Sequence, residues 1–208
     1  MKLTVRASET SKLMTSGEKI TATTLTWLKE KAVSQVLGLT SYVETKQMAK
    51  GLNCEQDSIS LLNAVLFENF KKNTDRIEKN GFTGSWDILK DGVIRDVKTS
   101  WSAATFPFFL EDAEKAVKQS GYDWQMRVYM MLTDSDIAYV DYCLIDTPEE
   151  LLTDWDDWEL HHVSHIPVTK RVTSVKVERD LELEKMMLDK YEIANTLYEG
   201  FIHELNNK

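Results

Sequence analysis

The sequence predicts a mixed α/β fold in which a central mixed β-sheet is flanked by helices. Helical periodicity dominates residues 8–70, strand and turn patterns dominate residues 74–99, and helices alternate with strands after residue 110. Such alternation is typical of helices packed on a sheet around a shared core. A chain of 208 residues with 42% hydrophobic residues is most simply one domain, spanning residues 1–208.

The first part of the chain is expected to be helical. Residues 8–15 predict a short helix with Ser8 as its N-cap. Apolar residues recur at helical spacing in Thr23–Leu37, and the glycine that follows ends this amphipathic helix. Lys46–Phe70 is predicted to form one long helix.

Residues 74–99 change to strand and turn character. The stretches Gly84–Leu89 and Ile94–Thr99 predict two short strands joined by the turn Lys90-Asp91-Gly92. Alternate side chains of a strand share one face, so charged residues on these strands can gather at one place.

The remainder of the chain alternates between helical and strand patterns. The predicted helices are residues 110–119, 122–132 and Leu181–Leu205, and the predicted strands are Ile137–Ile145, His161–Ile166 and Arg171–Val177.

Composition limits the classes of function. The formal net charge is -9, which argues against tight binding of a phosphate backbone, but the acids are concentrated in Glu149–Glu159 and Glu178–Glu184. We therefore expect modest, metal-dependent affinity for nucleic acid. Cys54 and Cys143 are too few for a four-cysteine zinc site or iron–sulfur cluster and predict free thiols in a reducing compartment. No membrane span or signal peptide is recognisable, so we expect a soluble intracellular protein.

Two acids and a lysine occupy the strands of the predicted hairpin. Asp96 and Lys98 share a face of the second strand, and Asp87 on the first strand can reach the same edge. Two carboxylates and one ammonium group form the set that a Mg²⁺-dependent phosphodiesterase needs. The alternative interpretation is a solvated strand face, which is a common setting for this spacing.

Two helical segments carry further candidates. Glu55 is expected inside a helix with Gly51 one turn earlier on the same face, where a glycine allows close approach. Gln125 and Tyr129 are four residues apart and hence neighbours on one helix face. Surface positions on amphipathic helices are the alternative for both sets.

Other polar and aromatic features are weaker candidates. The run His161–His165 lacks a cysteine or acid at zinc-site spacing, and Asp154–Glu159 lacks the glycine and closing glutamate of a calcium loop. An acidic, tryptophan-bearing surface loop accounts better for the second segment. Trp101 is a candidate for base stacking, with simple packing as the alternative.

Taken in order, these motifs resemble the PD-(D/E)XK nucleases, and more narrowly the lambda exonuclease/YqaJ branch of phage recombination nucleases. The resemblance rests on Arg6-Ala7-Ser8, Glu55 after Met-Ala-x-Gly, Asp87, Asp96-x-Lys98, Gln125-x-x-x-Tyr129, and Val175–Asp180 before a long helix. It spans nearly the whole chain and implies a restriction-endonuclease-like core.

The resemblance also implies a metal site. Asp87 and Asp96 would bind Mg²⁺ or Mn²⁺ with the backbone carbonyl of Val97, and Glu55 would complete the outer or second metal position. Many relatives carry glutamate where this chain has Asp96, so the carboxylate here has a shorter reach.

Roles toward the substrate are implied in the same way. Lys98 would act on the attacking water and Gln125 would help to place it. Ser8 and Arg6 would hold a terminal 5′-phosphate, and Tyr129 would pack and hydrogen-bond beside the DNA.

The resulting hypothesis is a metal-dependent exonuclease that resects double-stranded DNA ends in the 5′-to-3′ direction for recombination by single-strand annealing. The resemblance further implies a homo-oligomeric trimeric ring, a single-strand annealing protein as partner, and the cytoplasm of a phage-infected or lysogenic bacterium as location. The alternatives are a structure-specific or single-strand, RecB-like nuclease of the same fold, and a catalytically silent DNA-binding module.

Overall fold

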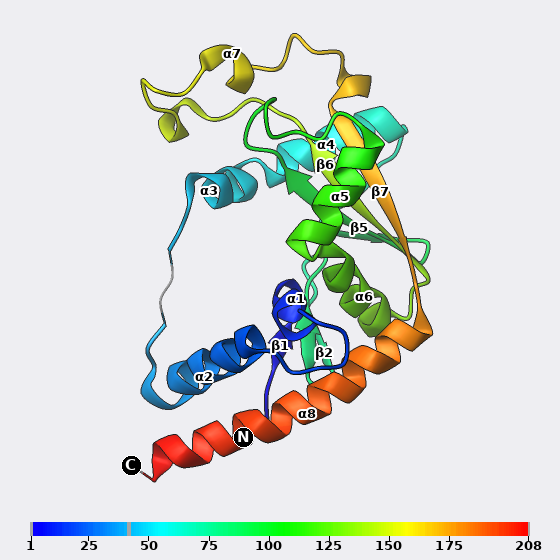
Figure 1. Cartoon of the computed structure of the whole chain (residues 1–208). Coiled ribbons are helices and arrows are strands. Elements are labelled where there is room, and N and C mark those ends of the chain that lie inside the picture. The colour runs from blue at the N-terminus through cyan, green and yellow to red at the C-terminus, as the bar shows by residue number, and fades with distance from the viewer. Residues whose placement is uncertain (1, 41–42, 208) are drawn as a thin grey trace.

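The computed structural model describes residues 2–40 and 43–207. It has two mixed β-sheets flanked by helices, which confirms the predicted fold class (Figure 1). The predicted hairpin, the helix pair around Gly121 and the closing helix are all present.

The larger sheet has the strand order β4-β5-β6-β7. Its strands are β4 (Ile88–Lys90), β5 (Val93–Thr99), β6 (Ile137–Cys143) and β7 (Val172–Glu178). β5 and β6 are parallel, whereas the two outer pairings are antiparallel. Asp91 and Gly92 both have positive φ and form the tight turn between β4 and β5, as the sequence predicted.

The smaller sheet has the order β1-β3-β2, formed by β1 (Val5–Arg6), β3 (Phe82–Gly84) and β2 (Ile77–Lys79). The predicted strand Gly84–Leu89 is therefore wrong as a single element: β3 ends at Gly84 and β4 begins at Ile88. The chain leaves one sheet and enters the other within this stretch, and Asp87 lies in the connection.

The N-terminal helices agree in part with the prediction. A 3₁₀ turn, η1 (Ala7–Glu9), precedes the short helix α1 (Thr10–Leu13). Ser8 lies exposed inside the turn, so its prediction as an N-cap is wrong. α2 (Ala22–Leu37) is capped by the Thr21 side chain and ends at Gly38 in the left-handed conformation, as predicted.

The predicted single helix Lys46–Phe70 is wrong. The segment forms α3 (Lys46–Asn53) and α4 (Glu55–Leu66), because the backbone at Cys54 leaves the helical region. Helical periodicity continues across the break, which is why the sequence pattern conceals it.

The second half contains three longer helices and several short turns. Their bounds are α5 (Leu110–Ser120), α6 (Tyr122–Thr133), α7 (Trp158–His161), α8 (Leu181–Asn206), η2 (Glu149–Leu151) and η3 (Val168–Lys170). The predicted strand His161–Ile166 is wrong, since this stretch is the end of α7 and an irregular loop. The strand predicted at Arg171–Val177 is confirmed as β7.

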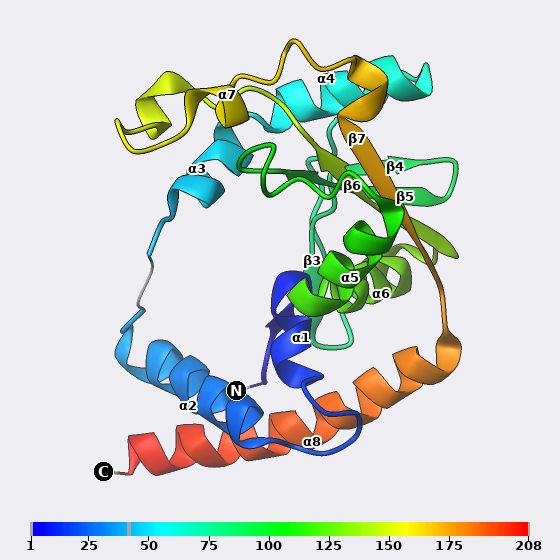
Figure 2. The ribbon, with the colours of Figure 1, turned by 45° about the horizontal axis from the view of Figure 1, so that its top comes forward.

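The larger sheet is covered on both faces. α4 packs on the face that carries Ile88 and Cys143, and α5 and α6 pack on the face that carries Ile94 and Val140. α2 and α8 lie side by side at the end of the molecule opposite α3, α4 and α7 (Figures 1 and 2).

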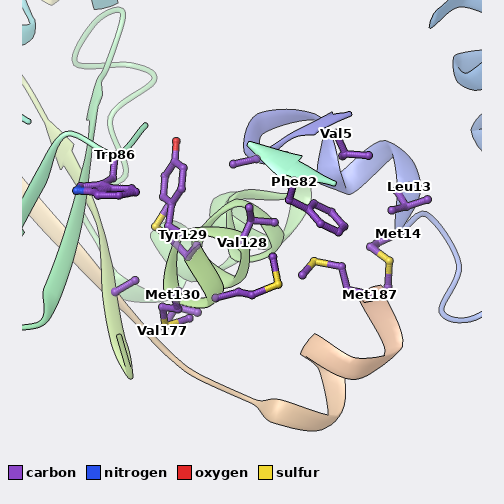
Figure 3. Packing of buried hydrophobic residues seen from close by; sticks show 14 of the residues in the cluster. Val5, Leu13, Met14, Phe82, Trp86, Val128, Tyr129, Met130, Val177 and Met187 are labelled. Atoms are coloured by element: carbon purple, nitrogen blue, oxygen red, sulfur yellow. The ribbon is translucent and has the colours of Figure 1, made fainter. Parts of the chain in front are cut away.

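α6 is the centre of the main hydrophobic cluster. Figure 3 shows Val128, Tyr129 and Met130 of α6 among buried side chains from the β3–β4 connection (Trp86), from β7 (Val177), from the N-terminal segment and from α8. The methionines of this helix are therefore core residues. Of the helices in residues 2–40 and 43–207, none combines the length and apolar character needed to cross a bilayer.

Substitution of Phe82 in β3 tests how much the packing of the smaller sheet against this core contributes to stability. Its ring is fully buried, with its centroid 5.3 Å from that of Tyr191 on α8. We expect Phe82→Ala to lower the free energy of unfolding by about 3–5 kcal/mol because it leaves a cavity. Urea denaturation followed by tryptophan fluorescence measures the loss. Phe109→Ala, at a side chain 72% exposed, is the control and should change stability by less than about 0.5 kcal/mol. An equal effect of both would contradict the packing.

Candidate active site

β5 places two oppositely charged side chains on the face of the sheet that α6 covers. Asp96 and Lys98 follow the buried Ile94 at every second position, so all three point the same way. Lys98 Nζ lies 2.6 Å from Asp96 Oδ2. Asp96 is only 3% exposed, so this ion pair lies at the inner end of the site.

Asp87 reaches the same place from the connection between β3 and β4. Its Oδ2 accepts a 2.6 Å hydrogen bond from the backbone N–H of Val97. The β4–β5 ladder ends at the pair Ile88 and Arg95, so the Asp87 carboxylate continues the pairing where the strand has stopped. Asn73 holds this connection by donating backbone and side-chain N–H groups to the carbonyls of Asp87 and Trp86.

The backbone of Val97 also presents an acceptor at this edge. In a strand, the N–H and C=O of one residue point to the same side. The N–H of Val97 points to Asp87. The carbonyl of Val97 therefore points to the same edge, beyond the end of the β4–β5 ladder at Ile88. The edge therefore offers carboxylate and carbonyl oxygens together.

α6 supplies the polar side chains opposite these acids. Gln125 Nε2 donates to the Tyr129 hydroxyl at 2.7 Å and lies 3.5 Å from Asp96 Oδ1, at the outer limit of hydrogen bonding. The absence of a side chain at Gly84 leaves space for the Tyr129 ring, because a Cβ at this position would lie 2.7 Å from it. The i, i+4 spacing in the sequence correctly indicated that Gln125 and Tyr129 share a face.

Tyr122 is a site residue that the sequence analysis missed. The ammonium of Lys98 lies 4.4 Å from the centroid of its ring. Tyr122 precedes Gln125 by three residues on α6, so the same helical spacing places both over β5. The ring holds the Lys98 side chain next to Asp96 by a cation–π contact.

Glu55 approaches from the other side of the sheet edge. It is the first residue of α4 and forms an ion pair with Lys72, a partner for which the sequence offered no signal. The negative charge of Glu55 is close enough to raise the pKa of Asp87. Gly51 lies on α3 rather than on the helix of Glu55, and a Cβ there would meet no atom within 4 Å. The predicted role of Gly51 in close approach is therefore wrong.

Electrostatic coupling links these groups. Burial and then the charge of Asp96 raise the pKa of Asp87 from 3.8 to about 8, although the Val97 N–H and Lys98 oppose the shift. Burial lowers the pKa of Lys98, but Asp96 overcomes this effect and raises it above its ordinary value. Burial followed by Asp96 also raises the pKa of Tyr129, which keeps the phenol protonated. The two carboxylates thus repel each other in a largely buried site that also contains the Lys98 ammonium group.

The donor set suits a hard divalent cation. The mutual repulsion of Asp87 and Asp96 is relieved by positive charge, and carboxylate and carbonyl oxygens are the ligands that Mg²⁺ and Mn²⁺ prefer. In the part of the chain that the structure describes, three or more acidic, histidine or cysteine side chains nowhere stand together as a ligand set. With Glu55 held by Lys72, the donors at this edge are two carboxylates and the Val97 carbonyl.

The residues expected near a terminal phosphate lie in the N-terminal segment. Arg6 forms a 2.8 Å ion pair with Glu9, and Ser8 is exposed. The ring of Trp101 packs edge-on against His161, with centroids 5.0 Å apart, and the carbonyl of Trp101 accepts from the buried Lys50. Binding of phosphate by Arg6 and Ser8 and base stacking by Trp101 stay predictions.

His161 and His162 contact neighbouring side chains of the same region. His161 Nδ1 lies 2.9 Å from Thr147 Oγ1, and the ring of His162 stacks on Trp158. Cys54 and Cys143 are both buried free thiols.

Comparisons with known proteins point to one class of enzyme. The chain superimposes on the crystal structure of a phage-related exonuclease from Haemophilus somnus 129PT with a TM-score of 0.92. The two are 32% identical, and the match covers 99% of this chain and 97% of the other. An alkaline exonuclease from Laribacter hongkongensis, LHK-Exo, has a TM-score of 0.64 at 17% identity over 98% of this chain and 92% of its own, which shows a shared fold. The chain matches no protein-family model and no curated protein.

The raised pKa of Asp87 predicts how stability depends on pH without divalent cations. Between pH 4 and 8 the native protein holds a proton that the unfolded chain has released, so stability should fall as pH rises, by up to about 1.4 kcal/mol per pH unit. Asp87→Asn removes this proton and should flatten the profile. Urea unfolding in EDTA from pH 4.5 to 8 measures the slope. Identical slopes for both proteins would contradict the coupling.

Proposed function

This chain belongs to the family of phage-related exonucleases, and we propose that it hydrolyses double-stranded DNA from its ends in the 5′-to-3′ direction with a divalent cation. Membership rests on the Haemophilus somnus relative, 32% identical over 99% of this chain. The observation that carries the proposal is the convergence of Asp87, Asp96 and Lys98 at the edge of β5, within reach of Gln125.

The acids and the Val97 carbonyl are the groups that would hold Mg²⁺ or Mn²⁺ in this proposal. When bound, such a cation neutralises charge on the phosphoryl oxygens and lowers the pKa of water. Glu55 contributes as an outer carboxylate, and Lys72 balances its charge.

Lys98 and Gln125 act on the attacking water and the phosphate. The raised pKa keeps Lys98 an ammonium group at neutral pH, so its Nζ donates hydrogen bonds rather than accepting a proton. Asp96 and the Tyr122 ring hold that Nζ in place. The Gln125 amide, held by Tyr129, is the second fixed donor facing the acids. Donors fixed before the reaction stabilise charge that develops on phosphoryl oxygens.

Further parts of the proposal concern the context of the reaction. A role in recombination by single-strand annealing, an annealing protein as partner, a homo-oligomeric ring and a location in the bacterial cytoplasm are supported by the resemblance to the lambda exonuclease/YqaJ nucleases. The phage-related description of the Haemophilus somnus protein agrees with this context.

Loss of either member of the buried ion pair should abolish catalysis. We expect Asp96→Asn and Lys98→Met to lower kcat on end-labelled duplex DNA with Mg²⁺ by at least about a thousandfold, because charge stabilisation of the transition state is lost. Asp91→Asn, at the exposed turn of the same hairpin, is the matched control and should retain full activity. Thermal unfolding establishes that each variant is folded. A folded Asp96→Asn enzyme with normal kcat would refute the site.

The nature of the DNA end separates the proposed activity from its alternatives. We expect rapid release of nucleotides from a linear duplex with a 5′-phosphate, slower release from a 5′-hydroxyl duplex, and no cleavage of closed circles. EDTA should stop the reaction, and added Mg²⁺ should restore it, because the repelling acids need a cation. Gel analysis of 5′- and 3′-labelled strands reports the polarity. Cleavage of circles would instead identify a structure-specific endonuclease.

A further inference from the structure

A groove beside the smaller sheet lies apart from Asp87, Asp96 and Lys98 and shares only Arg6 with the candidate site residues considered above. It encloses about 1030 Å³ between β1, η1, α1, α2 and α8. Buried aromatic residues, Trp27 from α2 and Tyr198 from α8, form part of its wall. Thr4, Ser34 and Gln35 add neutral hydrogen-bonding groups to its lining.

The charge of this groove is opposite to that of the whole chain. Its lining carries four cationic side chains, Lys2, Arg6, Lys12 and Lys31, against two acids, Glu9 and Glu30. The groove is thus locally positive in a protein whose formal net charge is -9. A positive groove in an acidic chain concentrates a polyanion at one place.

Glu9 organises two of these cations. Its carboxylate lies 2.8 Å from Arg6 Nη2 and 3.0 Å from Lys31 Nζ. The two cations lower the pKa of Glu9 to about 2 against the opposing effect of burial, so Glu9 is ionised at neutral pH. Lys31 is also held against the Trp27 ring, at 5.3 Å from its centroid. Each cation keeps further N–H donors for a ligand, because guanidinium has five and ammonium has three.

One strand, β3, links the groove to the catalytic edge, which is the edge of β5 where Asp87, Asp96 and Lys98 converge. Arg6 is paired with Thr83 of β3, and Asp87 follows Thr83 by four residues. Adjacent strands are about 5 Å apart and four residues span at most about 14 Å, so the two positions lie within about 19 Å. This corresponds to about six nucleotide steps of duplex DNA at 3.4 Å each. A duplex of ordinary length bound at the site is therefore long enough to reach the groove.

We propose that this groove, through Lys2, Arg6, Lys12 and Lys31, binds the phosphodiester backbone of the DNA substrate a few nucleotides from the scissile bond. In this proposal Arg6 contacts the backbone rather than the terminal 5′-phosphate that the resemblance implies for it. The inference rests on the proposed nuclease function and extends it by assigning a second binding surface. The groove supplies sequence-independent affinity, which an acidic chain cannot obtain from its overall charge.

Charge removal at the groove tests the proposal. Lys2 and Lys12 are exposed, so Lys2→Gln/Lys12→Gln removes two cations at little risk to the fold. Lys176→Gln/Lys185→Gln removes two exposed lysines outside the groove and is the matched control. Fluorescence anisotropy with a labelled 20-base-pair duplex in EDTA, from 50 to 200 mM salt, measures the affinity. We expect the groove variant to reduce the slope of log Kobs against log salt by about 1.8, and the control to leave it unchanged.

Two further measurements keep the proposal distinct from the nuclease assignment. Hydrolysis of the p-nitrophenyl ester of thymidine 5′-phosphate reports the catalytic edge alone, since this small diester cannot reach the groove. We expect the groove variant to raise KM for the duplex while keeping its kcat on the small diester. If the unaltered protein hydrolyses neither substrate, the nuclease function fails, and the anisotropy slopes still decide whether the groove binds DNA.

Three other outcomes would contradict the proposed binding of DNA in the groove. An unchanged salt slope and KM in the Lys2→Gln/Lys12→Gln protein would show that the backbone lies elsewhere. An equal effect of the control pair would show a general effect of charge. A change in oligomeric state, measured by sedimentation velocity, together with an unchanged slope would make the groove a contact between copies of the chain.

Discussion

The hydrogen bond between the Asp87 carboxylate and the Val97 amide is the interaction on which the catalytic edge depends. The β4–β5 ladder ends at the pair Ile88 and Arg95, and the Asp87 carboxylate takes the place of the backbone acceptor that β4 would otherwise offer to the Val97 N–H of β5. The bond joins the connection between the two sheets to the strand that carries Asp96 and Lys98. It also brings two carboxylates together where burial makes their repulsion strong.

β5 carries charges on both faces, and each is balanced locally. On the α6 side, Asp96 pairs with Lys98. On the α4 side, Arg95 binds both oxygens of the fully buried Asp141 at 2.8 Å, which fastens β5 to β6. Buried ion pairs contribute little net stability, but losing one partner is strongly destabilising. The register of β5 is therefore held firmly at the position that aims Asp96 and Lys98 at the site.

Positive and negative surfaces are separated along the chain. Acids gather in Glu149–Glu159, while the groove beside β1 collects Lys2, Arg6, Lys12 and Lys31. The net charge of -9 therefore says little about where a nucleic acid binds. Glu9, although acidic, strengthens the positive groove because it fixes Arg6 and Lys31 in place.

The sequence by itself determined most secondary structure and the side-chain pairs that depend on local periodicity: Asp96 with Lys98 on a strand, and Gln125 with Tyr129 on a helix. These follow from the fixed repeat of each element. It did not reveal the break at Cys54, the loop position of Asp87 or the partners Lys72 and Tyr122. Only the tertiary structure decided those, because a helix can stop without losing its apolar spacing, and contacts between distant segments depend on how sheets and helices pack together.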